Sequence, residues 1–183
     1  ALKITYTLKN HDLEVCWEVV NNDSETMYFT IGGHPAFRVP VREGESQSDY
    51  RLAFEGLDTL TYLLIDTSVG TVLADEPHTL SLENGTCSIA PHMFDKDALV
   101  FDNGQIQKAG ILFPDGTPYL TLTSEGFPNF GIWSVPGAPF VCLEPWMGRC
   151  DDCGFEKPLS EKANINVLKP DEEFIRSYQI TVH

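Results

Sequence analysis

The sequence predicts an all-β protein with antiparallel pairing, arranged as a sandwich or a barrel, and three observations indicate this. Apolar and polar residues alternate in many short runs, no 12-residue segment carries a clean helical period, and twelve prolines stand where helices would run. Strand-like runs recur at roughly 8–12-residue spacing, which is typical of sandwiches and barrels. Because no linker, repeat or low-complexity tract interrupts the chain, we expect residues 1–183 to form a single domain.

The predicted strands are defined by a period of two. In the run Leu13–Val20 the odd positions are Leu, Val, Trp and Val, and Glu14 and Glu18 stand between them, which predicts a half-buried strand. Phe174–Val182 repeats the pattern near the end of the chain. Between them, ten short runs rich in β-branched or aromatic residues are predicted as strands: Met27–Ile31, Tyr50–Phe54, Leu60–Leu64, Thr79–Leu82, Cys87–Ile89, Ala98–Phe101, Ala109–Phe113, Tyr119–Thr123, Gly131–Ser134 and Phe140–Leu143.

Turn residues support antiparallel pairing. The dipeptides Asn84-Gly85, Asn103-Gly104 and Asp115-Gly116 each separate two strand-like runs. Asn-Gly and Asp-Gly supply the positive φ angles that tight hairpins require. The first strand-like run, Leu2–Leu8, starts directly after an Ala at position 1. We therefore expect this chain to lack an N-terminal portion whose strands complete the sheet.

Composition narrows the possible partners. Acidic residues outnumber basic ones, 27 to 12, and the net charge of −15 would repel a phosphate backbone, so we expect no nucleic-acid partner. No apolar run approaches the roughly 18 residues that span a membrane, so we expect no membrane segment. The five cysteines, at positions 16, 87, 142, 150 and 153, are odd in number and dispersed. This usage predicts a reducing compartment, and the cytoplasm is the expected location.

Two proton-transfer side chains stand in unusual local sequences. His34 follows two glycines and precedes a proline, and Glu144 also precedes a proline, in the run Cys142–Trp146. Taken singly, each has an ordinary structural interpretation, as a hydrogen-bonded loop histidine or a glutamate that ends a strand. Together they predict an acid and a base that face one small substrate. Trp133 and Trp146 offer flat apolar faces on which a sugar ring can stack.

Other sites are less well supported by the sequence. The pair Cys150 and Cys153 forms a single CxxC without the second half of a zinc site, and it does not open a helix as a thioredoxin motif would. Nucleophile-elbow, dinucleotide and P-loop motifs are absent, so we expect neither a metal nor a cofactor. Asp97 precedes a strand, where it either forms a turn or presents a carboxylate at a sheet end. An acid and a base alone suit a reaction that only moves protons, such as opening and reclosing of a pyranose ring.

Four segments, in this order, resemble the aldose 1-epimerases, or galactose mutarotases, and in particular their LacX-like branch. They are Ile31–Phe37 (IGGHPAF), Asp97–Phe101 (DALVF), Gly131–Ser134 (GIWS) and Phe140–Gly148 (FVCLEPWMG). The resemblance implies a galactose mutarotase-like supersandwich that interconverts the α and β anomers of an aldose of the glucose or galactose type. It implies that Glu144 is the general base and His34 the general acid. Asp97, Trp133, Trp146 and Phe37 are the expected sugar-binding residues.

The sequence also departs from the family. Family members usually begin well upstream, and that upstream segment supplies an Arg and a second His to the sugar site; we expect it to accompany this chain. Two alternatives stay open. A carbohydrate-binding sandwich without turnover would not need an acid and a base together. A hexose-6-phosphate mutarotase would need a basic phosphate pocket, for which the sequence offers Arg38, Arg42, Arg149 and Lys157 near the motifs.

Overall fold

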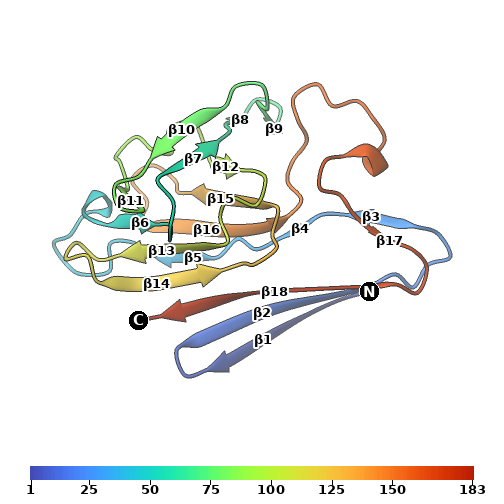
Figure 1. The fold of residues 1–183 in the computed structure, drawn as a ribbon, viewed down its shortest axis with the longest axis horizontal. Coiled ribbons are helices and arrows are strands. Elements are labelled where there is room, and N and C mark those ends of the chain that lie inside the picture. The colour runs from blue at the N-terminus through green and yellow to red at the C-terminus, as the bar shows by residue number, and fades with distance from the viewer.

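Two antiparallel β-sheets packed face to face form the body of the protein in the computed structural model, which describes residues 1–183 (Figure 1). The larger sheet has seven strands in the order β1 (Leu2–Lys9), β2 (Asp12–Val20), β18 (Glu173–Val182), β14 (Pro118–Thr123), β13 (Lys108–Leu112), β6 (Arg51–Ala53) and β11 (Thr86–Ser88). The smaller sheet has five, comprising β12 (Leu99–Phe101), β15 (Asn129–Trp133), β16 (Phe140–Met147), β4 (Ile31–Gly32) and β5 (Ala36–Arg38). The last two pair with successive parts of the same edge of β16.

Shorter elements surround the two sheets. Three antiparallel pairs lie outside them: β7 (Thr59–Tyr62) with β10 (His78–Ser81), β8 (Ile65–Asp66) with β9 (Thr71–Val72), and β3 (Met27–Phe29) with β17 (Asn166–Leu168). The helical segments are two single 3-10 turns, η1 (Gln47–Asp49) and η2 (Leu159–Glu161). The structure contains no helix with the length and apolarity that crossing a membrane requires. The all-β prediction is therefore confirmed.

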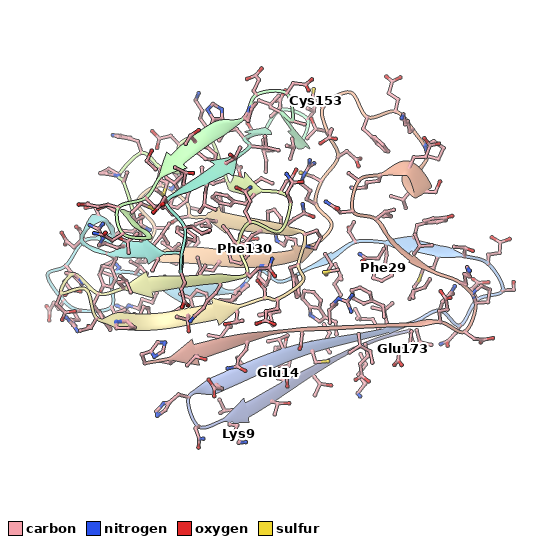
Figure 2. The ribbon with its side chains drawn as sticks, viewed as in Figure 1. Lys9, Glu14, Phe29, Phe130, Cys153 and Glu173 are labelled. Atoms are coloured by element: carbon pink, nitrogen blue, oxygen red, sulfur yellow. The ribbon has the colours of Figure 1, made fainter.

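The main hydrophobic core lies between the two sheets. Trp17 on β2 and Leu122 on β14 project into it from the larger sheet, and Phe130 on β15 and Leu143 on β16 meet them from the smaller one. Figure 2 labels Phe130 in this interior. Along β2 the buried positions alternate with less buried ones as the sequence predicted, with Trp17 at 3% exposure. Strand periodicity therefore identified the core-facing side chains correctly.

The three predicted turns behave differently. Asp115-Gly116 joins β13 to β14 as a hairpin, because the two strands pair and Gly116 takes a φ of 84°. Asn103-Gly104 instead connects β12 in the smaller sheet to β13 in the larger one. Asn84-Gly85 closes a tight local hairpin, because Glu83 and Thr86 exchange backbone hydrogen bonds across it, although β10 and β11 then pair with different strands. Positive φ at these positions fixed a sharp reversal, but pairing of the flanking strands was decided by the sheets they joined.

Strand β1 forms one edge of the larger sheet and leaves an apolar face open. Its even-numbered residues pair with the core-facing residues of β2, and Ile4 lies opposite Trp17 and Tyr6 opposite Val15. Trp17 is buried, whereas Tyr6 is 67% exposed. In Figure 1 the β1–β2 hairpin projects beyond the smaller sheet, which explains the difference. The open stripe consists of Leu2, Ile4, Tyr6 and Leu8.

Candidate active site

Strand β16 presents different side chains on its two faces. Val141, Leu143 and Met147 point into the core between the sheets. Glu144 and its even-numbered neighbours Cys142 and Trp146 therefore lie on the opposite, outer face of the smaller sheet. The candidate site is on this outer face.

The strand is longer than the sequence predicted. We expected it to end at Leu143, but β16 runs through Glu144 and Pro145 to Met147. Gly33 donates its N–H to the Pro145 carbonyl, so the missing N–H of that proline would point to the same side, toward the segment between β4 and β5. Leu143 donates to the carbonyl of Pro35, whose own missing N–H faces β16 in the same way. The two prolines thus leave one hydrogen bond to β16 on each side of His34, whose own backbone makes none.

His34 and Glu144 contact each other directly. His34 Nδ1 lies 2.8 Å from Glu144 Oε1, with the imidazole side chain 60% exposed and the carboxyl side chain 7% exposed. Burial raises the pKa of the Glu144 carboxyl to about 7, and the negative charge of Asp97 adds to the rise. The nearby imidazole and a hydrogen bond with Trp146 oppose it. The predicted acid and base therefore meet as one pair with a single exposed side.

Trp146 lies against two glycines on neighbouring strands. A Cβ on Gly131 would lie 2.3 Å from Trp146 Cζ2, and a Cβ on Gly32 would lie 2.5 Å from Trp146 Cδ1. Real Cβ atoms do not approach so closely, so both positions need to lack a side chain for the indole to lie there. The glycines of two motifs thus allow the indole to lie flat across the sheet beside Glu144.

Trp133 completes the apolar surroundings. It pairs with Cys142 in the β15–β16 ladder and therefore shares the face of Glu144. Its ring centroid lies 5.7 Å from that of His34. Both Trp133 and Trp146 pack against a small cluster on the outer face, which consists of Leu63, Val72, Ala98 and Val100. The site is thus an acid–base pair flanked by two tryptophans.

Asp97 stands at the entry to β12, as expected, and takes a φ of 73° that few side chains other than Asn and Asp tolerate. Its carboxylate accepts a hydrogen bond from the Ala98 N–H at 2.6 Å. The residue is half-buried, and its charge acts on the Glu144 carboxyl. The structure therefore brings Asp97 to the same site.

Phe37 is not brought to this site. It pairs with Val141 across the β5–β16 ladder, whereas its neighbour Ala36 pairs with Cys142. Phe37 consequently shares the core-facing side and packs against the main core cluster. The expectation that it contacts sugar rested on its place in the motif, and the alternation of the strand puts its ring on the other face.

The basic residues near the motifs do not form a phosphate pocket. Arg149 donates two hydrogen bonds to Asp102 in a fork and contacts Asp152, with 6% of its side chain exposed. Arg42 lies over the ring of Phe113, in contact with acidic residues. Arg38, next to Phe37 on β5, is exposed, and Lys157 is exposed with its ammonium 3.9 Å from Glu161. Buried and fully paired cations are poor anion ligands, because their charge is already balanced.

Cys142 was missed as part of the site. In the sequence it counted only as one of five dispersed cysteines. In the structure it lies two residues before Glu144 on the same face of β16. Its Sγ, His34 Nδ1 and a Glu144 carboxylate oxygen all lie within 4.8 Å of one another. Burial, with the added charge of Glu144, raises the pKa of this thiol to about 12. Two-residue spacing was the signal that could have found it, had the predicted strand been extended past Leu143.

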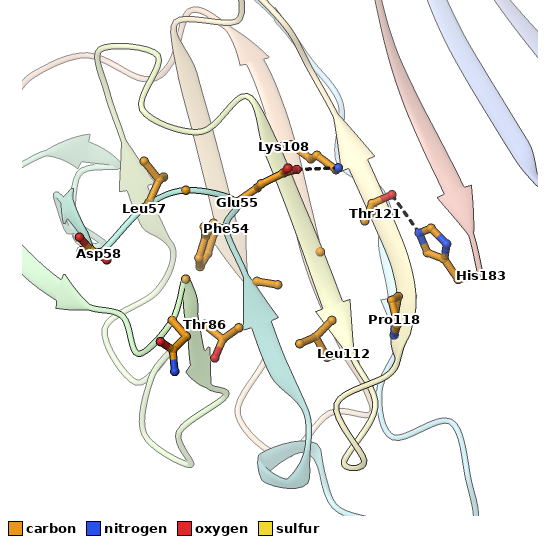
Figure 3. Close-up of a pocket in the computed structure, with 15 residues that line it drawn as sticks. Phe54, Glu55, Leu57, Asp58, Thr86, Lys108, Leu112, Pro118, Thr121 and His183 are labelled. Carbon is orange, nitrogen blue, oxygen red and sulfur yellow. Dashed lines mark hydrogen bonds and ion pairs between the residues drawn. The ribbon is translucent and has the colours of Figure 1, made fainter.

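A wide groove lies elsewhere, on the outer face of the larger sheet (Figure 3). It has a volume of about 640 Å³ and forms where Ala53 and Gly110 leave small gaps between longer side chains. An exposed ion pair of Lys108 and Glu55 crosses its rim. None of the site residues named above lines this groove, so its size says nothing about the acid–base pair.

The fold of this chain is similar to those of two proteins of known structure. The fold matches a galactose mutarotase-related enzyme from Lactobacillus acidophilus with a TM-score of 0.88 and 27% identity over 100% of this chain. A galactose mutarotase-like protein from Lactobacillus casei matches with a TM-score of 0.83, also at 27% identity over 100% of this chain. The architecture is therefore that of a galactose mutarotase-like β-sandwich.

The family profile for aldose 1-epimerase matches residues 1–173, so the chain belongs to the aldose 1-epimerase family. Its relatives include the plasmid and chromosomal LacX proteins of Lactococcus lactis subsp. lactis, each 29% identical over 99% of this chain, which places it with the LacX-like members. The chain spans 61% of the length of these LacX proteins, 61% of the L. acidophilus enzyme and 63% of the L. casei protein.

Proposed function

We propose that this protein is an aldose 1-epimerase that interconverts the α and β anomers of a hexose of the glucose or galactose type. The observation that carries the proposal is the direct contact of His34 and Glu144, 2.8 Å apart, between two tryptophans on one sheet face. Family membership supports the reaction class. A binding module without turnover has no need for a buried carboxyl of raised pKa beside an imidazole.

The chemistry follows from two neighbouring oxygens of the sugar. The anomeric hydroxyl and the ring oxygen are both attached to C1, so two groups that contact each other can reach both. The Glu144 carboxylate takes the proton of the anomeric hydroxyl, and the His34 imidazolium donates a proton to the ring oxygen as the C1–O bond breaks. Rotation about C1–C2 and the reverse transfers close the other anomer. A base whose pKa is about 7 suits this work at neutral pH.

The remaining residues would bind and orient the ring. Trp146 lies flat against Gly32 and Gly131, and its exposed side is the proposed stacking surface. Trp133 would bound the ring on the side of His34. Asp97 would accept hydrogen bonds from sugar hydroxyls, since its charge already acts on this site. We do not include Phe37, because it faces the core.

An upstream segment of the same protein is part of the proposal. The relatives are longer than this chain, and the apolar stripe on β1 leaves both an unpaired strand edge and an uncovered face. Such an edge and face pair readily with further strands. The segment would pair with β1, cover the stripe and contribute further polar groups to the sugar. Five free thiols support the proposal that the protein works in a reducing compartment, the cytoplasm.

Free sugars are the better substrate class than sugar phosphates. Arg149 is held by Asp102 and Asp152 and has no free donors directed at the pair of His34 and Glu144. Arg38 alone would not match the doubly charged phosphate of a hexose 6-phosphate. Polarimetry with glucose 6-phosphate as a second substrate tests this choice, and a higher kcat/KM for the phosphate would contradict it.

The central test is polarimetry of freshly dissolved α-galactose and α-glucose. Glu144→Gln keeps the shape of the side chain and removes its basicity, so the enzymatic rate should fall about 100-fold or more while sugar binding persists. Glu156→Gln, at an exposed position, is the matched control and should keep the wild-type rate. Wild-type rates in Glu144→Gln, or binding without any turnover in the wild type, would refute the assignment.

The role of His34 is tested by its pH dependence. A cationic imidazole is the required donor, so kcat should fall as pH rises and the imidazole loses its proton. His34→Asn should remove this alkaline limb together with most of the rate. If the variant keeps both rate and profile, another residue donates the proton, and the upstream segment is the place to search for it.

A further inference from the structure

Three side chains that bind transition metals converge on the outer face of the smaller sheet. His34 Nδ1, Cys142 Sγ and a Glu144 carboxylate oxygen all lie within 4.8 Å of one another. Cys142 and Glu144 are buried at alternate positions of β16, and His34 is exposed between β4 and β5. We infer that this triad binds a divalent cation of the Zn²⁺ class, and that the bound ion inhibits the enzyme.

The ligand types define the ion. An imidazole nitrogen and a thiolate sulfur favour Zn²⁺, Co²⁺ and related ions, whereas Mg²⁺ and Ca²⁺ prefer oxygen ligands. Three protein ligands leave one tetrahedral position for water. The CxxC pair of Cys150 and Cys153 supplies none of these ligands. The site comes from one strand and one loop that are distant in sequence.

The geometry requires a small adjustment. In a tetrahedral Zn²⁺ site with bonds of about 2.0–2.3 Å, the ligand atoms lie about 3.3–3.6 Å apart. The nitrogen and oxygen of the present pair are 2.8 Å apart and would have to separate slightly. The sulfur would have to approach from a separation of at most 4.8 Å. His34 can supply most of this movement, because 60% of its side chain is exposed and its own backbone makes no hydrogen bond to β16.

The charges of the site favour a cation. Burial raises the pKa of both Glu144 and Cys142, so the thiol and part of the carboxyl population are neutral before an ion binds. Asp97 adds a further negative charge close by, and the imidazole of His34 opposes its effect on the Glu144 pKa. A dication between the ligands would favour loss of the thiol and carboxyl protons and would then balance the charges of both groups and of Asp97. The protein as a whole, at a net charge of −15, attracts cations.

Binding exchanges protons for the ion. As the metal–sulfur bond forms, the thiol proton of Cys142 passes to solvent. The proton held between His34 Nδ1 and Glu144 Oε1 also leaves when both atoms bind the metal. The affinity therefore rises with pH, because ligands must be deprotonated to bind. An ion held in this way uses the same electron pairs that the acid and base need.

Binding of the ion to the triad and inhibition of the enzyme by that ion can be tested separately. Occupation of the triad rests on geometry alone, whereas inhibition rests on the function proposed above. Co²⁺ reports occupation without any assay of activity. A thiolate ligand gives cobalt an intense sulfur-to-metal charge-transfer band, and a four-coordinate site gives strong visible bands.

The first experiment titrates the reduced, untagged, metal-free protein with Co²⁺ and then displaces it with Zn²⁺. The wild type should show the charge-transfer band, which Zn²⁺ but not Mg²⁺ removes. Cys142→Ala should lose the band, and His34→Asn should weaken binding about 10-fold or more. Cys150→Ala is the matched control, since this half-buried thiol near Trp146 is outside the triad, and it should keep the band. Circular dichroism confirms that each variant is folded.

The absence of the band in the wild type, or its persistence in Cys142→Ala, overturns the site.

The second experiment compares mutarotation rates with and without Zn²⁺ at a concentration that fills the site. The ratio of the rate with Zn²⁺ to the rate without it should be well below one in the wild type and in Cys150→Ala. In Cys142→Ala it should be close to one. An unchanged ratio in the wild type overturns inhibition and leaves the site in place. If the metal-free wild type has no mutarotase activity, the proposed function fails while the cobalt spectrum still decides the site.

Discussion

Leu143 and Glu144 are neighbours on β16, but Leu143 is buried in the core and Glu144 lies on the outer face of the smaller sheet. Leu143 has no exposed surface and packs among side chains of both sheets. Glu144 is almost as buried, at 5%, yet it meets an exposed imidazole, an indole and a thiol. The comparison shows that burial alone does not distinguish the two faces. The chemistry of the neighbours does, because a buried carboxyl needs polar partners that a leucine does not.

The largest change in stability should come from the core-facing side of β16. Leu143→Ala leaves a cavity at a fully buried position, so the free energy of unfolding should fall by about 2–5 kcal/mol. Urea denaturation followed by circular dichroism measures this. Leu159→Ala, at a position with 51% exposure, is the matched control and should change stability by about 0.5 kcal/mol or less. Equal losses in the two variants would contradict the distinction.

The next effect concerns the pH dependence of stability on the open face. Burial raises the pKa of Glu144 to about 7 in the folded protein, above its ordinary value of 4.5. The group therefore stabilises the fold fully below about pH 4.5, and this contribution is lost as pH rises through about 7. Between pH 4.5 and 8 the loss should be about 1–3 kcal/mol. Glu144→Gln should lack it, whereas Glu156→Gln should follow the wild type in urea titrations across this range. Identical pH profiles for wild type and Glu144→Gln would show that the carboxyl is not held protonated.

A smaller effect should follow from crowding the indole. Gly131→Ala would place a Cβ 2.3 Å from Trp146 Cζ2, so the ring must move, at a cost of about 1–3 kcal/mol. Near-ultraviolet circular dichroism and sugar affinity should both change. Adding Trp146→Phe, which shortens the ring, should recover part of the lost stability. A fully additive double variant would mean that the two residues do not contact each other as described.

The smallest effect should come from apolar residues that no core seals. Tyr6→Ser changes a side chain with 67% exposure and should shift unfolding by about 0.5 kcal/mol or less in this chain. Tyr178→Ser, on the same inner face but 7% exposed, should cost several times more. In a longer polypeptide that includes the proposed upstream strands, the cost of Tyr6→Ser should rise. An unchanged small cost there would argue against coverage of the stripe.

Much of the fold could be read from local pattern. The alternation along β2 and β18 predicted which residues face the core, and Asp115-Gly116 predicted a hairpin. Asn103-Gly104 was less informative, because the turn carries the chain from one sheet to the other. A dipeptide fixes the backbone of a reversal, but the partners of the following strand depend on contacts far along the chain.

The sequence by itself determined the all-β class, the core-facing sides of β2 and β18 and the two motifs with His34 and Glu144. These are properties of residue order, since side chains alternate along a strand and proline and glycine fix local backbone. Only the tertiary structure decided which face of β5 carries Phe37, that Arg149 is neutralised by Asp102, and that Cys142 joins the acid–base pair. Each depends on the register between distant strands, and a shift of one residue in that register would exchange the sealed face for the open one.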